Sequence, residues 1–77
     1  MNPQIERMVG NNLRIIRERN RMTQNEVAAK LQVAGCDITR SALAKIEVGQ
    51  RHLYPDEIIA LRTILNVSYD EILSIEK

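Results

Sequence analysis

The chain contains few of the residues that usually build large cores or covalent scaffolds. Among its 77 residues there is no Trp, no Phe and a single Cys, with two Tyr, two Pro and three Gly. One cysteine excludes an intramolecular disulfide and suits a reducing compartment, so we expect the cytoplasm. Because large aromatic side chains are scarce, the core must come from Ile, Leu, Val and Ala, which suits short, closely packed helices.

Two kinds of segment are also missing. No apolar run approaches the ~20 residues that cross a bilayer, and no signal-peptide pattern opens the chain, so we expect no membrane partner. Strand-like β-branched runs between turn residues are absent, so we expect no sheet. The length predicts one all-α domain over residues 1–77.

Charge is distributed unevenly along the chain. Residues 1–53 contain nine Lys/Arg and five Asp/Glu, a net +4, whereas residues 54–77 contain two and five, a net −3. A polyanion would be attracted to the first part. The alternative is random scatter of charges over solvated faces.

Start and stop signals divide the chain into five helices. The first is expected over about 4–20, the second from Thr23, the third after Thr39, the fourth from Pro55 and the fifth from Ser68. Glutamates three residues after Thr23 and Ser68 predict capping boxes. The expected inward faces of the first two helices are Ile5, Val9, Leu13 and Ile16, and then Val27, Leu31 and Ala34.

A second pattern supports these starts. An apolar residue before each cap and another four positions after it form a hydrophobic staple. The four staple pairs are Met22 with Val27, Ile38 with Leu43, Leu53 with Ile58, and Val67 with Ile72.

The third helix has two chemically different sides. Leu43 and Ile46 define its buried side, and the opposite side presents Ser41, Ala44, Lys45 and Val48, with Arg40 in the first turn. Small side chains let a helix backbone approach base edges, and Arg and Lys can donate to guanine O6 and N7. The alternative is an ordinary solvated amphipathic helix.

Residues 9–73 resemble the helix-turn-helix domain of the XRE/Cro–repressor family, which includes the lambdoid phage repressors. The matching stretches are Val9-Gly10-x-x-Leu13-Arg14-x-Ile16-Arg17, Met22-Thr23-Gln24-x-Glu26-Val27-Ala28, Thr39 to Gly49 followed by Arg51, and Leu65-Asn66-Val67-Ser68. The resemblance implies a compact five-helix, lambda-repressor-like bundle whose helix-turn-helix spans about 23–49. It implies a third helix in the major groove, with bases read at Arg40, Ser41, Ala44 and Lys45.

The resemblance also implies contacts to the DNA backbone. Gln24, the first residue of the second helix, is expected against a phosphate, and a helix N-terminus offers free N–H groups to an anion. In the loop after Gly49, phosphate contacts are expected from Gln50, Arg51 and His52. The alternatives are plain surface roles for Gln24 and His52.

Arg17 and Glu47 are expected to form a structural ion pair. On their helical wheels both lie at the edge of an apolar seam, where an unpaired charge is costly. The family has an Arg–Glu pair at these positions, which would orient the third helix without reading DNA. The alternative is that both side chains reach solvent separately.

The turn between the second and third helices departs from the family. Residues 32–38 add about four residues, so we expect an extra helical turn to Ala34 and a reversal at Gly35-Cys36-Asp37. This insertion affects the expected angle between the two helices. Cys36 is expected to be a buried or half-buried filler.

Together these features predict a sequence-specific double-stranded-DNA-binding transcriptional regulator, in particular a repressor, encoded by a bacterium or phage. It would bind a palindromic operator as a homodimer, through a surface formed by Tyr69, Leu73 and Ile75. The alternative for these apolar residues is completion of the intrachain core. Two isolated tyrosines favour duplex DNA over single strands, which are usually gripped by stacking platforms.

Two other functional classes fit the sequence less well. An antitoxin or other protein-binding module is built on the same domain, but few residues follow Leu73 to form a toxin-binding tail. For an enzyme there is no catalytic arrangement, phosphate loop or cluster of metal ligands, so we expect no activity, cofactor or metal. We also expect no pocket of ~300 Å³.

Overall fold

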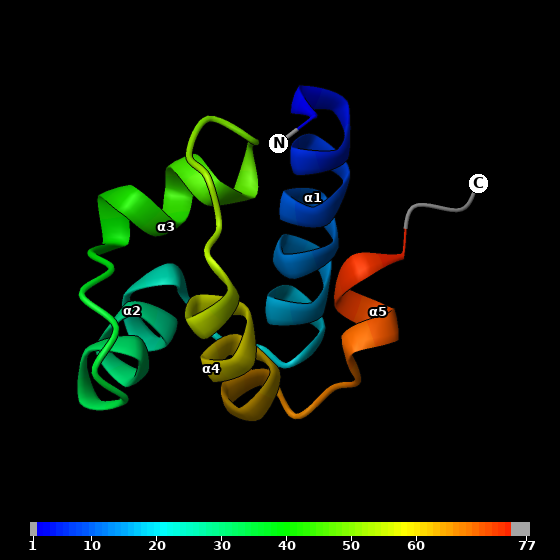
Figure 1. The fold of residues 1–77 in the computed structure, drawn as a ribbon. Helices are drawn as coiled ribbons and strands as arrows, with labels where there is room; N and C mark the ends of the chain where they lie inside the picture. Colours follow the sequence, from blue (N-terminus) through cyan, green and yellow to red (C-terminus); the bar gives the residue numbers. More distant parts are fainter. Residues whose placement is uncertain (1, 75–77) are drawn as a thin grey trace.

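The computed structural model describes residues 2–74 of the chain. These residues form five helices and no strand (Figure 1). The helices are α1 (Pro3–Arg19), α2 (Gln24–Val33), α3 (Arg40–Glu47), α4 (Pro55–Leu65) and α5 (Tyr69–Leu73). The predicted all-α fold and its five helices are confirmed.

The expected capping residues begin α2, α3 and α5. The hydroxyls of Thr23 and Ser68 accept from the backbone N–H groups of Glu26 and Glu71, whose carboxylates accept in return from the cap N–H groups. The hydroxyl of Thr39 accepts from the N–H of Ala42 across 3.1 Å. These bonds satisfy donors that the first turn of a helix leaves free.

Helix α4 begins without a side-chain cap. Tyr54 is its cap residue, and the Glu57 carboxylate accepts from the Tyr54 N–H across 3.0 Å. Pro55 follows at the first helical position, where the missing N–H costs nothing.

The core lies where all five helices meet and is entirely aliphatic apart from Cys36. The staple residues Val27, Ile38, Leu43, Leu53 and Ile72 are buried in it, and Met22, Ile58 and Val67 pack against it. The remaining core residues are Val9, Leu13, Ile16, Leu31, Cys36, Ile46, Leu61 and Leu65.

Two residues predicted on apolar faces are placed differently. Ala34 is exposed because α2 ends at Val33, one residue earlier than expected, and Ala34 is the C-cap. Ile5 lies in the first turns of α1, beyond most of the packed helices, and is 36% exposed. Ala34 lines an open hollow beside Thr63 and Ile64 of α4, and Ile5 lines a hollow beside Leu73 of α5, so neither side chain is fully covered.

The lengthened turn between α2 and α3 is anchored rather than loose. Gly35 reverses the chain with φ +90, a conformation that favours glycine. Cys36 and Ile38 then point into the core, which confirms the expected burial of Cys36. The Gln32 side chain donates to the Ile38 carbonyl across 3.0 Å, so the turn is held from both sides.

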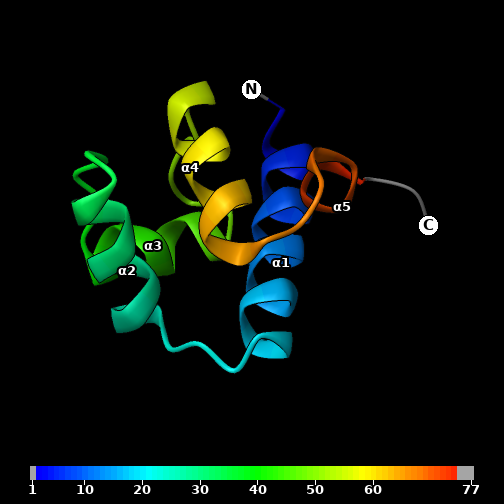
Figure 2. The ribbon, with the colours of Figure 1, turned by 90° about the horizontal axis from the view of Figure 1, so that it is seen from below.

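The helices are arranged so that α1 contacts α3 and α5, and α2 contacts α3 and α4. Seen from below, α2 and α1 lie on opposite sides of the molecule, and the α1–α2 connection runs along the lower edge (Figure 2). Helix α3 therefore packs against both of the helices that precede it.

Candidate nucleic-acid interface

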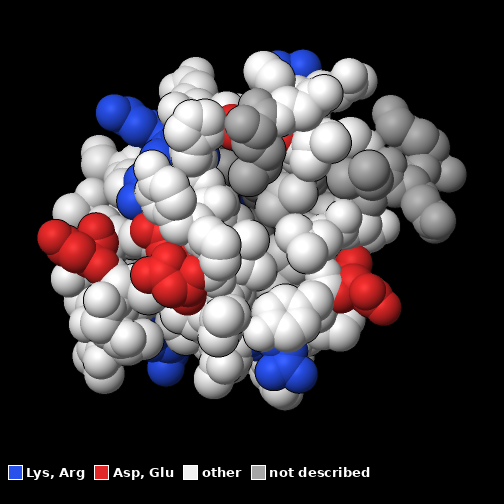
Figure 3. All heavy atoms as spheres, viewed as in Figure 1, with Lys and Arg blue, Asp and Glu red and all other residues white. Residues whose placement is uncertain are grey.

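Helix α3 keeps its polar side outward. Leu43 and Ile46 are 1% and 2% exposed, whereas Arg40, Ser41 and Lys45 on the other side are exposed. Ala44 is half-buried, and Val48, the C-cap residue, is 54% exposed. On the face drawn in Figure 3, basic atoms lie at the upper left with acidic atoms below them, and further basic atoms lie at the top and along the lower edge. The residues predicted to read bases thus lie on one accessible helix surface.

Arg17 and Glu47 form a two-bond ion pair between α1 and α3. Arg17 Nε lies 2.7 Å from Glu47 Oε2, and Nη2 lies 3.1 Å from Oε1. The Glu47 side chain is only 2% exposed, and that of Arg17 is 11% exposed. The hydrogen bond to Glu47 raises the pKa of Arg17 above its ordinary value, so the guanidinium stays charged.

The same pair is connected to the start of α2. Arg17 Nη1 donates to the Met22 carbonyl across 2.8 Å, and Gln24 Nε2 donates to Glu47 Oε1 across 3.0 Å. Glu47 therefore accepts from α1 and α2 at once. This network fixes the angle at which α3 leaves the rest of the molecule, and Gln24, the predicted phosphate contact, is part of it.

Two of the predicted phosphate contacts after α3 face carboxylates. Arg51 Nη1 and Nη2 lie 2.9 and 3.1 Å from the two oxygens of Glu57, and Nη1 also donates to the His52 carbonyl. His52 Nδ1 lies 2.6 Å from Glu6 Oε2 on α1. Gln50, the third residue of this loop, is exposed. The structure thus leaves Gln50 accessible and ties Arg51 and His52 to neighbouring elements.

Glu57 was not anticipated as a partner of Arg51. Burial raises the pKa of Glu57, but hydrogen bonds from Arg51 and from the Tyr54 N–H outweigh it, so the pKa lies below its ordinary value. A glutamate three residues after the cap position Tyr54 was the available sequence signal. The Glu6–His52 contact joins residues 46 positions apart and has no comparable local signal.

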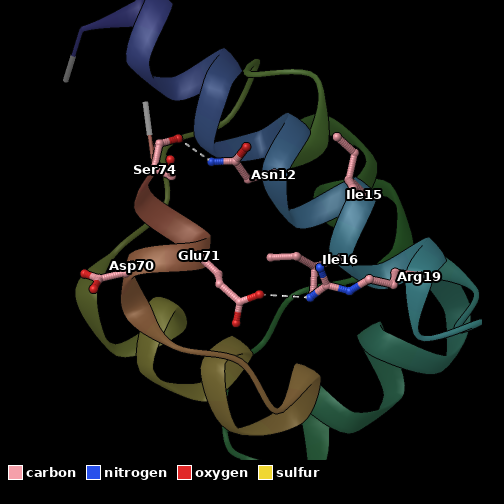
Figure 4. Close-up of a pocket in the computed structure, with 7 residues that line it drawn as sticks. All are labelled: Asn12, Ile15, Ile16, Arg19, Asp70, Glu71 and Ser74. Atoms are coloured by element: carbon pink, nitrogen blue, oxygen red, sulfur yellow. Dashed lines mark hydrogen bonds and ion pairs between the residues drawn. The ribbon is translucent and has the colours of Figure 1, made fainter. Parts of the chain in front are cut away.

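An open hollow between α1 and α5 corrects one expectation. Its volume is about 420 Å³, larger than we expected any pocket to be. The Asn12 side chain donates to the Ser74 and Ile72 carbonyls, and Arg19 pairs with Glu71 at 3.2 Å (Figure 4). The other lining residues are Ile15, Ile16 and Asp70. Helix α5 is too short to fill the groove beside α1, and the sequence pattern does not show this.

Within residues 2–74, no group of three or more His, Cys, Asp or Glu side chains is placed to hold a metal ion. In the same range, no helix is both long and apolar enough to span a bilayer.

Helices α2 and α3 form a capped pair that the Arg17–Glu47 ion pair holds against α1, and α3 exposes Arg40, Ser41 and Lys45. This arrangement defines a helix-turn-helix DNA-binding domain. A family model described as helix-turn-helix matches residues 13–72. The chain belongs to this family, of the XRE type, and is a DNA-binding helix-turn-helix regulator. No curated protein and no solved structure matches it.

Proposed function

We propose that this protein is a transcriptional repressor that recognises a specific duplex sequence with α3 in the major groove. The observation that carries the proposal is the division of α3 into a buried apolar side and an exposed side with Arg40, Ser41 and Lys45. The cytoplasm of a bacterium, or of a cell carrying a phage, is the compartment that suits this activity.

Four residues of α3 are proposed to read bases. Arg40 and Lys45 reach furthest and can donate to guanine O6 and N7. Ser41 can donate or accept, and Ala44 can contact a thymine methyl group. Because these residues share one side of a single helix, they would face one strip of the major groove.

The phosphate contacts are proposed at Gln24 and Gln50, and at Arg51 and His52 if these two exchange their carboxylates for phosphate. Gln24 has a second amide hydrogen beyond the one that Glu47 accepts. Arg51 would have to leave the two oxygens of Glu57, so its role at a phosphate stays a prediction.

We further propose a homodimer formed through the surface of α1 and α5. Ile15, Tyr69 and Leu73 are 47%, 41% and 45% exposed there; Ile75, also predicted on this surface, lies outside the described residues. Arg19 and Asp70 lie beside these apolar groups, and opposite charges could pair across a two-fold, self-complementary interface. Two copies would then read half-sites roughly 10 base pairs apart.

Selection of bound sites from a pool of random duplexes tests the function. A repressor of this kind should enrich a palindrome with half-sites one helical turn apart, and a variant in which Arg40 and Lys45 are both alanine should not. A pool without enrichment would contradict the proposal. If a single protein partner co-purifies while no duplex is enriched, the antitoxin alternative is favoured. A monomeric mass at micromolar concentration, with and without the enriched duplex, would contradict the dimer.

A further inference from the structure

Within residues 2–74, four arginines each contact a carboxylate: Arg14, Arg17, Arg19 and Arg51. The other four, Arg7, Arg21, Arg40 and Arg62, are exposed and make no ion pair with any described residue. Arg40 begins α3 and Arg62 stacks on Tyr69, which leaves Arg7 and Arg21 without an assigned contact. Neither belongs to the helix-turn-helix, and neither was singled out by its sequence pattern.

Arg21 lies in the α1–α2 connection and is fixed relative to α3. Its N–H donates to the Glu18 carbonyl across 2.9 Å. The carbonyl of the next residue, Met22, accepts from Arg17, which in turn holds Glu47 at the end of α3. The position of Arg21 is therefore set by the same network that orients the recognition helix.

The backbone at Arg21 is unfavourable for an arginine. Its φ is +58, in the left-handed region where side chains with a Cβ are strained and glycine is not. Backbone conformation alone would therefore favour glycine at this position.

Arg7 lies on the face of α1 that meets α3. Gly10, one turn further along this face, touches the backbone of Ile46 and Glu47. Gly49, just past α3, is so close that a Cβ on it would lie 2.8 Å from the Cα of Arg7. The last turn of α3 therefore lies against α1 between Arg7 and Arg21.

The spacing of the two arginines suits the width of a DNA groove. They are 14 positions apart, and the part of this stretch that lies within α1, from Arg7 to Arg19, spans about 18 Å at the helical rise of about 1.5 Å per residue. The major groove is about 12 Å wide, so two long side chains at this separation can reach the sugar-phosphate strands on either side of it. A guanidinium binds phosphate through paired N–H donors.

We propose that Arg7 and Arg21 are two further phosphate contacts, which flank α3 on duplex DNA. The inference rests on the proposed function and deepens it. It adds two side chains outside the helix-turn-helix to the contacts proposed at Gln24 and Gln50, and neither has to leave a carboxylate as Arg51 and His52 would.

Binding of the full chain to duplex DNA at 50 to 200 mM salt tests this. The probes are a fluorescent duplex of random sequence and, once selected, the specific duplex. Each lost phosphate contact lowers the slope of log affinity against log salt by about 0.9. For Arg21→Gly and for Arg7→Gln we expect that reduction per protomer, so the loss of affinity over this fourfold salt range becomes about 3.5-fold smaller for a bound monomer and about twelvefold smaller for the proposed dimer. Affinity at 50 mM should fall equally for both duplexes.

Two further measurements separate the inference from simpler effects. Lys30→Gln removes one positive charge from the last turn of α2, where Lys30 is exposed beside Thr63 and Ile64 of α4, and it should leave the slope unchanged. Arg21→Gly should leave Tm unchanged or raise it, because glycine accepts φ +58. Weaker binding by a protein of equal or greater stability excludes misfolding as the cause.

The possible outcomes separate a failure of this inference from a failure of the proposed DNA-binding function. If the unsubstituted protein binds no duplex, the proposed function fails and the inference fails with it. If the unsubstituted protein binds, but Arg7→Gln and Arg21→Gly have the same slope as Lys30→Gln, only the assignment of these arginines is overturned.

Discussion

Gly10 of α1 packs directly against the backbone of α3 at Ile46. A Cβ at position 10 would collide with the Ile46 carbonyl oxygen and lie 3.0 Å from the carbonyl carbon of Glu47. Both are backbone atoms, so they cannot turn away as a side chain would. The two helices therefore approach closely only because residue 10 has no side chain.

Gly10→Ala should destabilise the fold by about 1–3 kcal/mol, the usual cost of overpacking. This sign is opposite to the helix preference of alanine, which alone favours the substitution by about 1 kcal/mol. Urea unfolding followed by circular dichroism measures the difference. Asn11→Ala, at the adjacent exposed position, is the control and should change stability far less. A more stable Gly10→Ala protein would show that α1 and α3 are not in contact here.

Arg17→Met should cost about 3–5 kcal/mol of unfolding free energy, because it leaves the buried Glu47 carboxylate without its cation. Combining it with Glu47→Leu should restore much of the loss, since no charge then remains buried. Arg14→Met is the matched control. Its pair with Glu18 is 42% and 54% exposed, and such a pair contributes about 0–1 kcal/mol. Equal losses for the two single variants would contradict a buried pair.

Acid should unfold the protein by protonating three glutamates at helix starts. Hydrogen bonds from the Thr23 and Ser68 backbones lower the pKa of Glu26 and Glu71, with Arg19 adding to the effect on Glu71. The pKa of Glu57 is lowered by Arg51 and the Tyr54 N–H despite its burial. A carboxylate whose pKa is lower in the folded state than in the unfolded state stabilises the fold at pH values above its unfolded-state pKa, which is near 4.5. This stabilisation is lost as the pH falls through the folded-state pKa.

The measurement is the urea midpoint between pH 7 and pH 3. It should be flat at the upper end and fall below about pH 4.5. The triple variant Glu26→Gln, Glu57→Gln, Glu71→Gln should be less stable at pH 7 and should lose less on acidification. If the urea midpoint of the triple variant falls below pH 4.5 as steeply as that of the unsubstituted protein, the loss of stability in acid is due to other carboxylates.

Local signals predicted the helix starts well because each depends on residues close in sequence. Thr23 with Glu26, and Ser68 with Glu71, form capping boxes that need only three residues of chain. The two residues of each staple pair are five positions apart, and they identify which side of each helix enters the core. Both are properties of a single turn of helix.

The site depends on contacts between distant segments, and there the sequence was less informative. A helical wheel placed Arg17 and Glu47 at matching seam edges, and the structure brings them together. No pattern indicated that Gln24 would also reach Glu47, or that Glu6 would meet His52. These contacts depend on where α1 lies relative to α2 and to the loop after α3, which periodicity within one helix does not determine.

Arg40→Ala should reduce discrimination at one base pair of the operator by about 1–3 kcal/mol, because a donor in the first turn of α3 is removed from the groove. The measurement is affinity for the enriched palindrome and for duplexes with single symmetric changes. The variant should bind equally well whichever base pair stands at one operator position, and it should keep the base preferences of the unsubstituted protein at the other positions. Its stability should match that of the unsubstituted protein, since Arg40 is exposed and makes no ion pair with residues 2–74. Uniform weakening over all duplexes would instead place Arg40 at a phosphate, and α3 would then enter the groove in a different register.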